Sequence, residues 1–399
     1  MKVGVLIPSS APERGGAYSF EWRIFDELLN QTHSDLEFVW IRKSAGMPLD
    51  PRIRPEACLD LEGQLGNRWI NSLDIRLNRL RRTFNPDRME LTRRERNLTS
   101  LLRSRMDLLW SLTPTPLSTR LPFVCPVWDL QHRLQPFMPE FTEGLEWELR
   151  ERYHWATYPK AAGLFVGTER GAQELKQFYG IDRSRICINP FPTPRLDADA
   201  VQASVEAVLK KYGLERGYIY YPAQFWPHKN HYNLLLALHY LHKQNYPLTL
   251  VLTGSDKGRL QKIKGLSDSL GLGDTVRILG FVPEPDVNAL YQGALLLCFP
   301  SLFGPDNIPP LEAMANRCPA AVADVPGARD QLKDAAIYFD PTSPSSIAYA
   351  VSQIHDDSCL RQTLIAAGIT LSDGLTVQNY VQTAVNYING LAPLLNNQL

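Results

Sequence analysis

A proline-rich loop in the last third of the sequence leads into a helix that has a carboxylate near its start. The loop and helix read Phe299-Pro-Ser-Leu-Phe-Gly-Pro-Asp-Asn-Ile-Pro-Pro-Leu-Glu-Ala-Met-Ala315. We expect the helix to open around Pro309 or Pro310, because the missing N–H of proline costs nothing in a first helical turn. Asn307 can then serve as N-cap, and Glu312 falls near free backbone N–H groups that favour anions. Glu312 is thus a candidate for binding a ligand, and the alternative is that it only caps the helix.

A second candidate is a polar loop near the N-terminus that contains two adjacent glycines. An apolar run over 2–7 is typical of a buried strand, and the loop with Gly15 and Gly16 follows it. Without side chains, these glycines let backbone N–H groups and a helix N-terminus approach a phosphate. Many α/β proteins begin in this way, so the loop by itself is only weak support for a phosphate site.

The elements that would position these residues alternate between strands and helices. Apolar residues recur at helical spacing over 18–29, 169–179 and 230–243. Buried strands are predicted at 2–7, 36–41, 107–112, 123–128, 162–167, 185–189, 217–221, 248–253, 276–279, 294–299, 320–323 and 336–339. Such alternation indicates parallel sheets that are covered by helices on both faces.

The predicted fold class is α/β, with two Rossmann-like, doubly wound domains in tandem. A chain of 399 residues exceeds what one core usually serves, which is about 250–300 residues. We expect an N-terminal domain over 1–192, a C-terminal domain over 193–372 and a helix over 373–399, for which packing back on the N-terminal domain is one possible arrangement. Ligands of open α/β sheets bind outside the carboxyl ends of the strands, so the chemistry is expected in a cleft between the domains.

Composition and motifs exclude several classes of protein. Lys and Arg number 42 and Asp and Glu also number 42, which argues against a protein whose main task is binding nucleic acid. The Gly-x-Gly-x-x-Gly and Walker A patterns are both absent, which disfavours a simple dehydrogenase or P-loop kinase. The six cysteines form no Cys-x-x-Cys pair, which disfavours zinc and suits a reducing cytoplasm.

Charge is unevenly spread along the chain. Residues 281–399 hold four Lys and Arg against eleven Asp and Glu, so the first 280 residues carry the matching positive excess. The stretch 68–107 holds eleven Arg beside leucines at helical spacing, and such a basic amphipathic segment can lie on anionic lipid. Peripheral contact with an anionic membrane and ordinary solvated charge both stay open.

The loop and helix over 299–315 resemble the donor-binding signature of retaining glycosyltransferases of family 4 (group 1), which use two Rossmann-like domains in the GT-B fold. The family form has two glutamates eight positions apart, followed by Ala-Met-Ala. Glu312 matches the second glutamate, which implies a bidentate grip on the ribose of a sugar nucleotide. Gly304 stands where the first glutamate would contact the transferred sugar, and Asp306 is a candidate substitute. The resemblance also implies that Asn307, Ile308 and Leu311 contact the donor.

The segment Tyr221-Pro-Ala-Gln-Phe-Trp-Pro-His-Lys-Asn230 is similar to the family loop whose lysine contacts the donor diphosphate. Lys229 fits that role, since a fixed ammonium in a dry site stabilises the departing diphosphate. Gln224 stands where the family often has arginine, and Gln224 and Asn230 join the implied donor contacts.

Three further loops carry the resemblance. Gly280–Tyr291 looks like the loop whose backbone receives the nucleobase, at Phe281 and Val282. Gly15 and Gly16 lie where the family has a loop that faces the diphosphate and the acceptor. The segment Val127-Trp-Asp-Leu-Gln-His-Arg133 is similar to a loop of mannosyltransferase-like members, where Asp129 and His132 would hold sugar or acceptor hydroxyls or else bond the loop backbone.

The resemblance implies a retaining transferase that moves a hexose from a nucleotide diphosphate sugar to a hydroxyl of a glycan or glycolipid. Mannose from GDP-mannose is the first choice, on the resemblance around Asp129 and His132. No metal is expected, because Lys229 can serve where a cation would. A cofactor and a nucleic acid partner are not expected either. A UDP-sugar transferase, a phosphorylase of the same fold and a non-catalytic sugar-nucleotide-binding protein remain alternatives. The protein is expected in the cytoplasm, where it can also lie peripherally at the inner face of the membrane.

Overall fold

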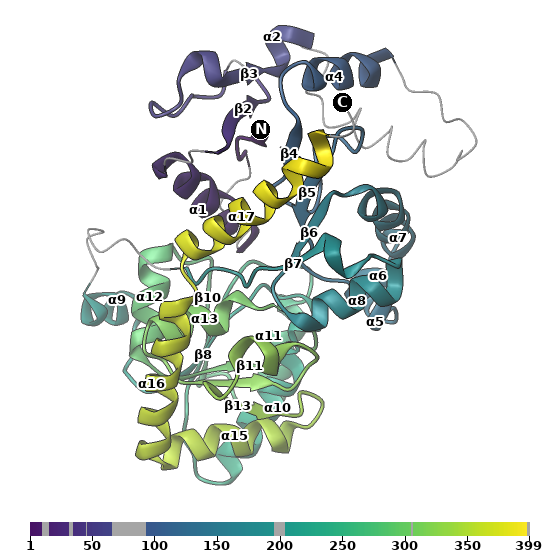
Figure 1. Ribbon diagram of the computed structural model, residues 1–399. Coiled ribbons are helices and arrows are strands. Elements are labelled where there is room, and N and C mark those ends of the chain that lie inside the picture. The colour runs from purple at the N-terminus through teal and green to yellow at the C-terminus, as the bar shows by residue number, and fades with distance from the viewer. Residues whose placement is uncertain are drawn as a thin grey trace.

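Two parallel β-sheets form the centres of two domains that follow one another along the chain (Figure 1). The computed structural model describes residues 1–9, 16–31, 35–44, 46–65, 93–194, 204–304 and 306–396. The seven strands of the first sheet are β1 (Lys2–Leu6), β2 (Glu37–Arg42), β3 (Cys58–Asp60), β4 (Leu108–Trp110), β5 (Phe123–Pro126), β6 (Gly163–Val166) and β7 (Ile186–Ile188). The six strands of the second are β8 (Tyr218–Pro222), β9 (Leu250–Thr253), β10 (Val276–Gly280), β11 (Ala294–Phe299), β12 (Ala320–Ala323) and β13 (Ala336–Phe339).

Every strand predicted from the apolar runs is present, and neighbouring strands pair in parallel register. The central strands are buried on both faces, which explains why they read as continuous apolar runs. Strand β3 was not predicted, because three residues are too few to show a period. The α/β fold class is therefore confirmed.

Helices cover both faces of each sheet. In the first half they are α1 (Gly16–Asn30), α2 (Leu61–Leu65), α4 (Arg93–Arg103), α5 (Gln131–Leu134), α6 (Pro139–Thr142), α7 (Glu146–Thr157) and α8 (Glu169–Tyr179). In the second half they are α9 (Val205–Tyr212), α10 (His231–Lys243), α11 (Leu260–Ser269), α12 (Glu284–Gly293), α13 (Ile308–Ala315), α14 (Ala328–Leu332), α15 (Pro344–Asp356), α16 (Ser358–Gly374) and α17 (Val377–Asn396). Short 3-10 turns lie at Pro55–Ala57, Tyr158–Lys160, Arg183–Arg185 and Pro227–Lys229.

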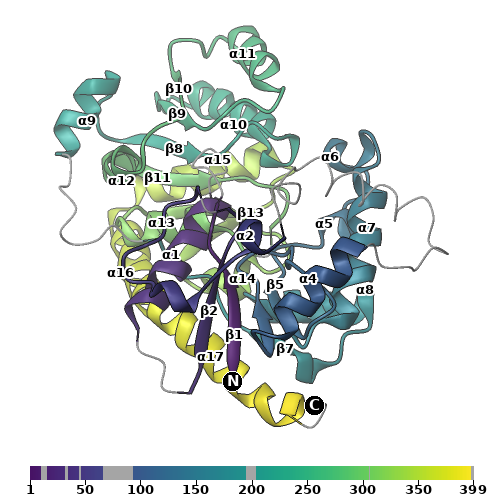
Figure 2. The ribbon, with the colours of Figure 1, turned by 90° about the horizontal axis from the view of Figure 1, so that it is seen from above.

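The last helix, α17, returns to the first domain. Its buried residues Tyr380, Val381, Ala384 and Ile388 belong to the same core as Phe20 of α1. Figures 1 and 2 show α17 in yellow, running beside α1 and ending on the domain that holds the N-terminus. The backbone N–H of Thr193 also donates to the carbonyl of Leu375 at 2.8 Å, so two connections join the domains at one place.

Both sheets place their first and fourth strands side by side. The orders are β3-β2-β1-β4-β5-β6-β7 and β10-β9-β8-β11-β12-β13. In such sheets the connections run in opposite directions on either side of the first strand, and ligands bind at the carboxyl ends of the strands at this point. The loops after β8 and β11 are therefore where a ligand of the second domain is expected.

The structure describes only part of the basic stretch that the sequence suggested for an anionic membrane. Within the stretch 68–107, helix α4 packs inward through Leu98 and Leu102, while residues 68–92 lie outside the described residues. Among the helices described, none combines the length and the apolar character needed to cross a bilayer.

Candidate active site

The turn that carries Lys229 is fixed from both sides. It follows β8, and the hydroxyl of Tyr221 donates to the Lys229 carbonyl at 2.7 Å. Asn230 adopts a left-handed backbone (φ 58°), and its buried amide donates to the carbonyls of Pro300 and Pro341 at 3.0 and 2.8 Å. Both amide hydrogens of Asn230 are thus engaged inside the domain. Asn230 therefore positions Lys229, and its side-chain donors are not available to a ligand.

The Lys229 ammonium lies over the ring of Phe299, with 5.3 Å from Nζ to the ring centroid. Burial lowers the pKa of Lys229 to about 8, while the carboxylates of Asp129 and Glu140 oppose that fall. No ion pair joins this ammonium to another residue within the part of the chain that the structure describes. The site therefore offers a partly desolvated cation that can bind an anion.

Glu312 lies on α13, which follows the neighbouring strand β11. Burial raises the pKa of its carboxyl, the hydroxyl of Tyr291 opposes that rise by donating to Oε2 at 2.9 Å, and Glu284 adds to it. The Tyr291 hydroxyl also lies 3.2 Å from the carbonyl of Pro309, so it links the carboxylate to the start of its own helix. The carboxylate is thus held in one orientation, as binding to two vicinal hydroxyls would require.

The loop before α13 has no room for a glutamate at the first family position. Gly304 has a φ of +119°, and a Cβ atom there would come within 2.5 Å of Asn307 Oδ1. Asn307 occupies the N-cap position of α13, but it caps nothing: its amide donates back to the Gly304 carbonyl at 2.7 Å. Asn307 is thus the N-cap residue as expected, but its side chain makes no capping hydrogen bond. The other two implied contacts point inward, since Ile308 packs against the core of the first domain and Leu311 is fully buried.

Asp306 is turned toward the first domain. Its Oδ2 accepts a hydrogen bond from the backbone N–H of Gly167 at 3.2 Å, just after β6. Its Oδ1 is buried and has no partner. Burial raises the pKa of Asp306 to about 7, and Glu174 and Asp330 add to the rise. Asp306 therefore serves as a contact between the domains.

The remaining implied donor contacts are Gln224, Phe281, Val282, Gly15 and Gly16. Gln224 accepts from Trp226 Nε1 at 3.0 Å through its Oε1. The Phe281 ring is 63% exposed and Val282 is buried, and the backbone N–H of Gly254 bonds the Gly280 carbonyl at 2.8 Å. This loop thus has an anchored backbone, as backbone recognition of a base would need. Gly16 is the first residue of α1, whereas Gly15 lies outside the described residues.

The two residues expected to contact an acceptor differ in placement. Asp129 is half-buried and accepts from the backbone N–H of Gln131 and from Arg150, both at 3.1 Å. Burial acts against ionisation of Asp129, but Arg150 and the backbone N–H of Gln131 together outweigh burial and lower the pKa of Asp129. His132 is fully enclosed, with Nε2 3.1 Å from Glu151 and 3.2 Å from the Tyr179 hydroxyl. His132 is thus an interior residue of the first domain, and the expectation that it contacts an acceptor does not fit this placement.

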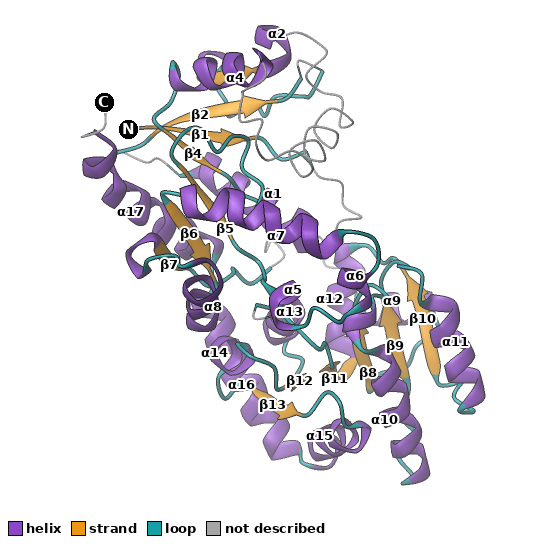
Figure 3. Ribbon diagram, turned by 90° about the vertical axis from the view of Figure 1, so that its right-hand side faces the viewer, coloured by secondary structure: helices purple, strands orange, loops and turns teal. Residues whose placement is uncertain are grey.

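A segment of the first domain that had no predicted role reaches across to the second. Figure 3 shows α6 at the end of α7 that faces the second domain. Gln135 donates to the Leu302 carbonyl at 2.8 Å, and the ring of Phe141 stacks on that of Phe303. Glu140 accepts from the backbone N–H and from Nδ1 of His228, at 2.9 and 2.7 Å. These partners lie far apart in the sequence and follow no local pattern, so spacing alone could not pair them.

A second bridge between the domains lies close to Glu312. Arg23 of α1 is bonded to Glu284 at the start of α12, and both charges act on the Glu312 carboxyl. The two domains therefore meet through side chains near Lys229 and near Glu312.

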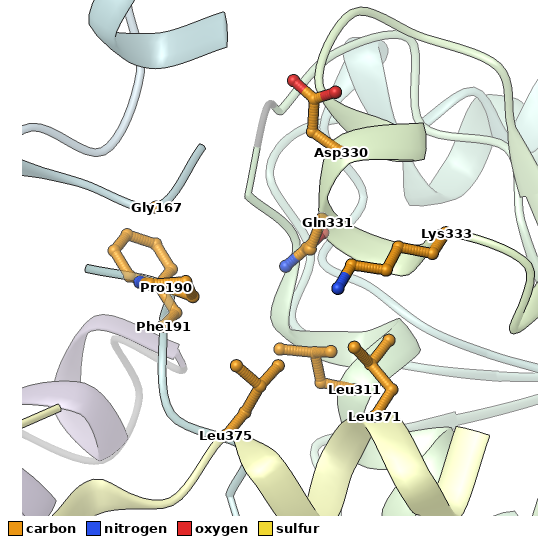
Figure 4. A pocket seen from close by; sticks show the side chains of 9 residues that line it. All are labelled: Gly167, Pro190, Phe191, Leu311, Asp330, Gln331, Lys333, Leu371 and Leu375. Atoms are coloured by element: carbon orange, nitrogen blue, oxygen red, sulfur yellow. The ribbon is translucent and has the colours of Figure 1, made fainter. Parts of the chain in front are cut away.

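A cavity of about 80 Å³ lies behind α13 (Figure 4). Its walls come from both domains, with Gly167 and Phe191 on one side and Leu311, Gln331 and Lys333 on the other. Sites for drug-sized ligands usually enclose roughly 300–1,000 Å³. The cavity is thus too small for a sugar nucleotide and is distinct from the loops around Lys229. Within the described ranges, no group of three or more His, Cys, Asp or Glu side chains could hold a metal ion.

Part of the chain is similar in sequence to known glycosyltransferases. The family model described as glycosyl transferases group 1 matches residues 206–370. O-antigen chain mannosyltransferase B of Escherichia coli is 28% identical over 183 residues, which are 45% of this chain and 48% of that protein. O-antigen chain mannosyltransferase RfbU of Salmonella typhimurium is 30% identical over 129 residues, which are 32% of this chain and 36% of that protein. The match thus spans half or less of the length of each of these relatives.

Solved structures match over nearly the whole chain. Sucrose-phosphate synthase from Thermosynechococcus elongatus is 15% identical, has a TM-score of 0.72, and covers 98% of this chain and 99% of its own. WaaG, a glycosyltransferase involved in lipopolysaccharide biosynthesis, is 17% identical with a TM-score of 0.66, over 97% of this chain and 100% of its own. Anabaena HepE in complex with UDP and glucose is 16% identical with a TM-score of 0.68, over 98% of this chain and 100% of its own. At these identities the likeness to solved structures shows the fold, which is the GT-B fold, and residues 206–370 match the model of the group 1 glycosyl transferases.

Proposed function

We propose that this protein is a retaining glycosyltransferase that moves a hexose from a nucleotide diphosphate sugar to an acceptor hydroxyl. The observation that carries the proposal is that Lys229 lies in the turn after β8 and Glu312 lies on α13, which follows the adjacent strand β11. The turn offers a cation with no ion-pair partner among the described residues, and the helix offers a fixed carboxylate. A nucleotide sugar needs both, for its diphosphate and for its ribose hydroxyls.

The roles follow from charge. Negative charge grows on the diphosphate as the glycosidic bond breaks, and a preorganised ammonium stabilises this charge more in the transition state than in the ground state. Lys229 supplies that ammonium, while Glu312 accepts hydrogen bonds from the ribose and holds the nucleotide in place. The departing phosphate can accept the proton of the acceptor hydroxyl, so no side-chain nucleophile is required.

Mannose is the sugar that we favour, with GDP-mannose as donor. Support comes from the relatives named as mannosyltransferases. Their names also refer to O-antigen chains, which supports a glycan or glycolipid as acceptor. A UDP-sugar is the second candidate, because HepE shares the fold and binds UDP together with glucose. Contact with an anionic membrane and a cytoplasmic location remain part of the proposal.

The test is the release of nucleoside diphosphate from a panel that contains GDP-mannose, UDP-glucose and other sugar nucleotides. We expect turnover of one donor, and preferential use of GDP-mannose supports the mannose assignment. Binding of one donor without turnover of any would instead favour a non-catalytic sugar-nucleotide-binding protein. Liposomes with and without anionic lipid, at low salt, test the membrane contact: equal retention on both contradicts it.

A further inference from the structure

Glu140 on α6 holds a carboxylate with one occupied and one unoccupied oxygen. Its side chain is 10% exposed, and Oε1 accepts both hydrogen bonds from His228. The other oxygen, Oε2, is buried and has no hydrogen-bond partner. Hydrogen bonds from His228 lower the pKa of Glu140 despite burial, so the group carries its negative charge at neutral pH. A buried, charged acceptor without a donor is costly and calls for an explanation.

The surroundings of Glu140 point to what could supply that donor. His228 directly precedes Lys229, and the carboxylate acts on the Lys229 ammonium. The His228 ring stacks on Phe303 with 4.0 Å between centroids, and Phe303 stacks in turn on Phe141. The Leu302 N–H donates to the His228 carbonyl at 2.8 Å. Glu140 is therefore held between the Lys229 turn and the loop after β11, beside the ammonium to which the proposed function assigns the diphosphate.

Resting on the proposed function, we infer that Glu140 Oε2 accepts a hydrogen bond from a hydroxyl of the transferred sugar. A sugar hydroxyl is a neutral donor that fits beside an anion, and Lys229 balances the charge of the carboxylate. The loop after β11 supplies no carboxylate at Gly304, and Asp306 is turned to Gly167. The sugar contact thus comes from the first domain, so that it exists only when the domains are closed on the donor.

Glu140→Gln is the informative variant. It keeps the shape and an acceptor for His228, and it replaces the free oxygen with an NH₂ group that has no charge. Glu143→Gln is the matched control, because Glu143 lies in the same segment, is 77% exposed and faces Arg259 at 3.6 Å. The probes are GDP-mannose and GDP, and UDP-glucose and UDP, each measured for binding by calorimetry and for turnover.

We expect Glu140→Gln to lower kcat/KM at least tenfold for the donor that the wild type uses. It should also weaken binding of the sugar nucleotide at least fivefold, while binding of the nucleoside diphosphate changes less than twofold. Glu143→Gln should match the wild type in both. A purely structural role of Glu140 would weaken both ligands alike, through the Lys229 turn, and would overturn the inference.

The inference and the proposed function fail in different ways. Absence of turnover in the wild type sinks the proposed function, and the binding comparison still decides the role of Glu140. If Glu140→Gln keeps the wild-type preference for sugar nucleotide over nucleoside diphosphate, Glu140 does not contact the sugar. If the wild type binds sugar nucleotide no better than nucleoside diphosphate, Glu140 likewise does not contact the sugar.

Discussion

The carboxylate of Asp306 accepts a hydrogen bond from the backbone N–H of Gly167, and this bond joins the two domains at 3.2 Å. The approach is so close that a Cβ atom on Gly167 would lie 2.2 Å from Asp306 Oδ1. Only glycine at 167 therefore allows the loop after β11 to dock on the end of β6. This contact lies two residues from the Gly304 turn and six from Glu312, so it helps to set the position of the donor loop.

The first prediction concerns this contact. Gly167→Ala should lower the free energy of unfolding by about 1–3 kcal/mol, the usual cost of overpacking. Urea unfolding measures it, and Gly265→Ala is the control, because a Cβ atom there meets nothing within 4 Å. Adding Asp306→Ala to Gly167→Ala removes the clash, so the double variant should lose less than the sum of the single losses. Additive losses would contradict the proposed clash.

The second prediction concerns pH. The pKa of Asp306 is raised to about 7 in the folded protein, above its usual value of 3.8, so folding favours the protonated form. The contribution of Asp306 to the free energy of unfolding is therefore fully present below pH 4 and is lost as the pH rises toward 7. Asp306→Asn cannot ionise, so it should exceed the wild type by about 1–3 kcal/mol at pH 8, the range for an unpaired buried polar group.

Thermal unfolding from pH 5 to pH 8 checks this prediction. The advantage of Asp306→Asn should shrink as the pH falls to 5, because wild-type Asp306 is then mostly protonated. Glu174 and Asp330 also act on this carboxyl, so Asp330→Asn should lower the Asp306 pKa and narrow the gap. A gap that does not depend on pH would show that Asp306 does not titrate in this range.

The sequence predicted the strands better than the contacts between domains. Strand β11 has the bounds of its apolar run, Ala294–Phe299, because a strand buried on both faces needs an unbroken run. The predicted series of strands also placed Lys229 after β8 and Glu312 after β11, where the structure has them. Glu140 and His228 could not be paired in advance, since their contact depends on how two separate domains dock. For His132 the sequence left contact with hydroxyls and bonding to the loop backbone both open, and neither included its partners Glu151 and Tyr179, which come from two later helices.

The third prediction concerns the orientation of Glu312. Glu312→Gln should abolish measurable turnover, because the amide offers one acceptor oxygen and no charge where the carboxylate offers two charged oxygens to the two ribose hydroxyls. Tyr291→Phe keeps the carboxylate and removes only the bond that orients it. A lost hydrogen bond of this kind costs about 0.5–1.5 kcal/mol, which weakens nucleotide binding by about two- to tenfold. Calorimetry with GDP and UDP measures both variants, and wild-type affinity in Glu312→Gln would refute the ribose contact.

The fourth prediction concerns the charge of Lys229. Burial lowers its pKa to about 8, so the free protein loses the ammonium as the pH rises above 8. Affinity for a nucleoside diphosphate should therefore fall between pH 7 and pH 9 in the wild type. Lys229→Met retains contact with Phe299 but has no charge, so its binding should be weak and flat with pH and its turnover about 10²–10³-fold lower. Lys257→Met is the control, because this exposed lysine lies over Trp226 nearby and its loss should leave the pH profile unchanged. The same pH profile in Lys229→Met as in the wild type would assign the titration to another group.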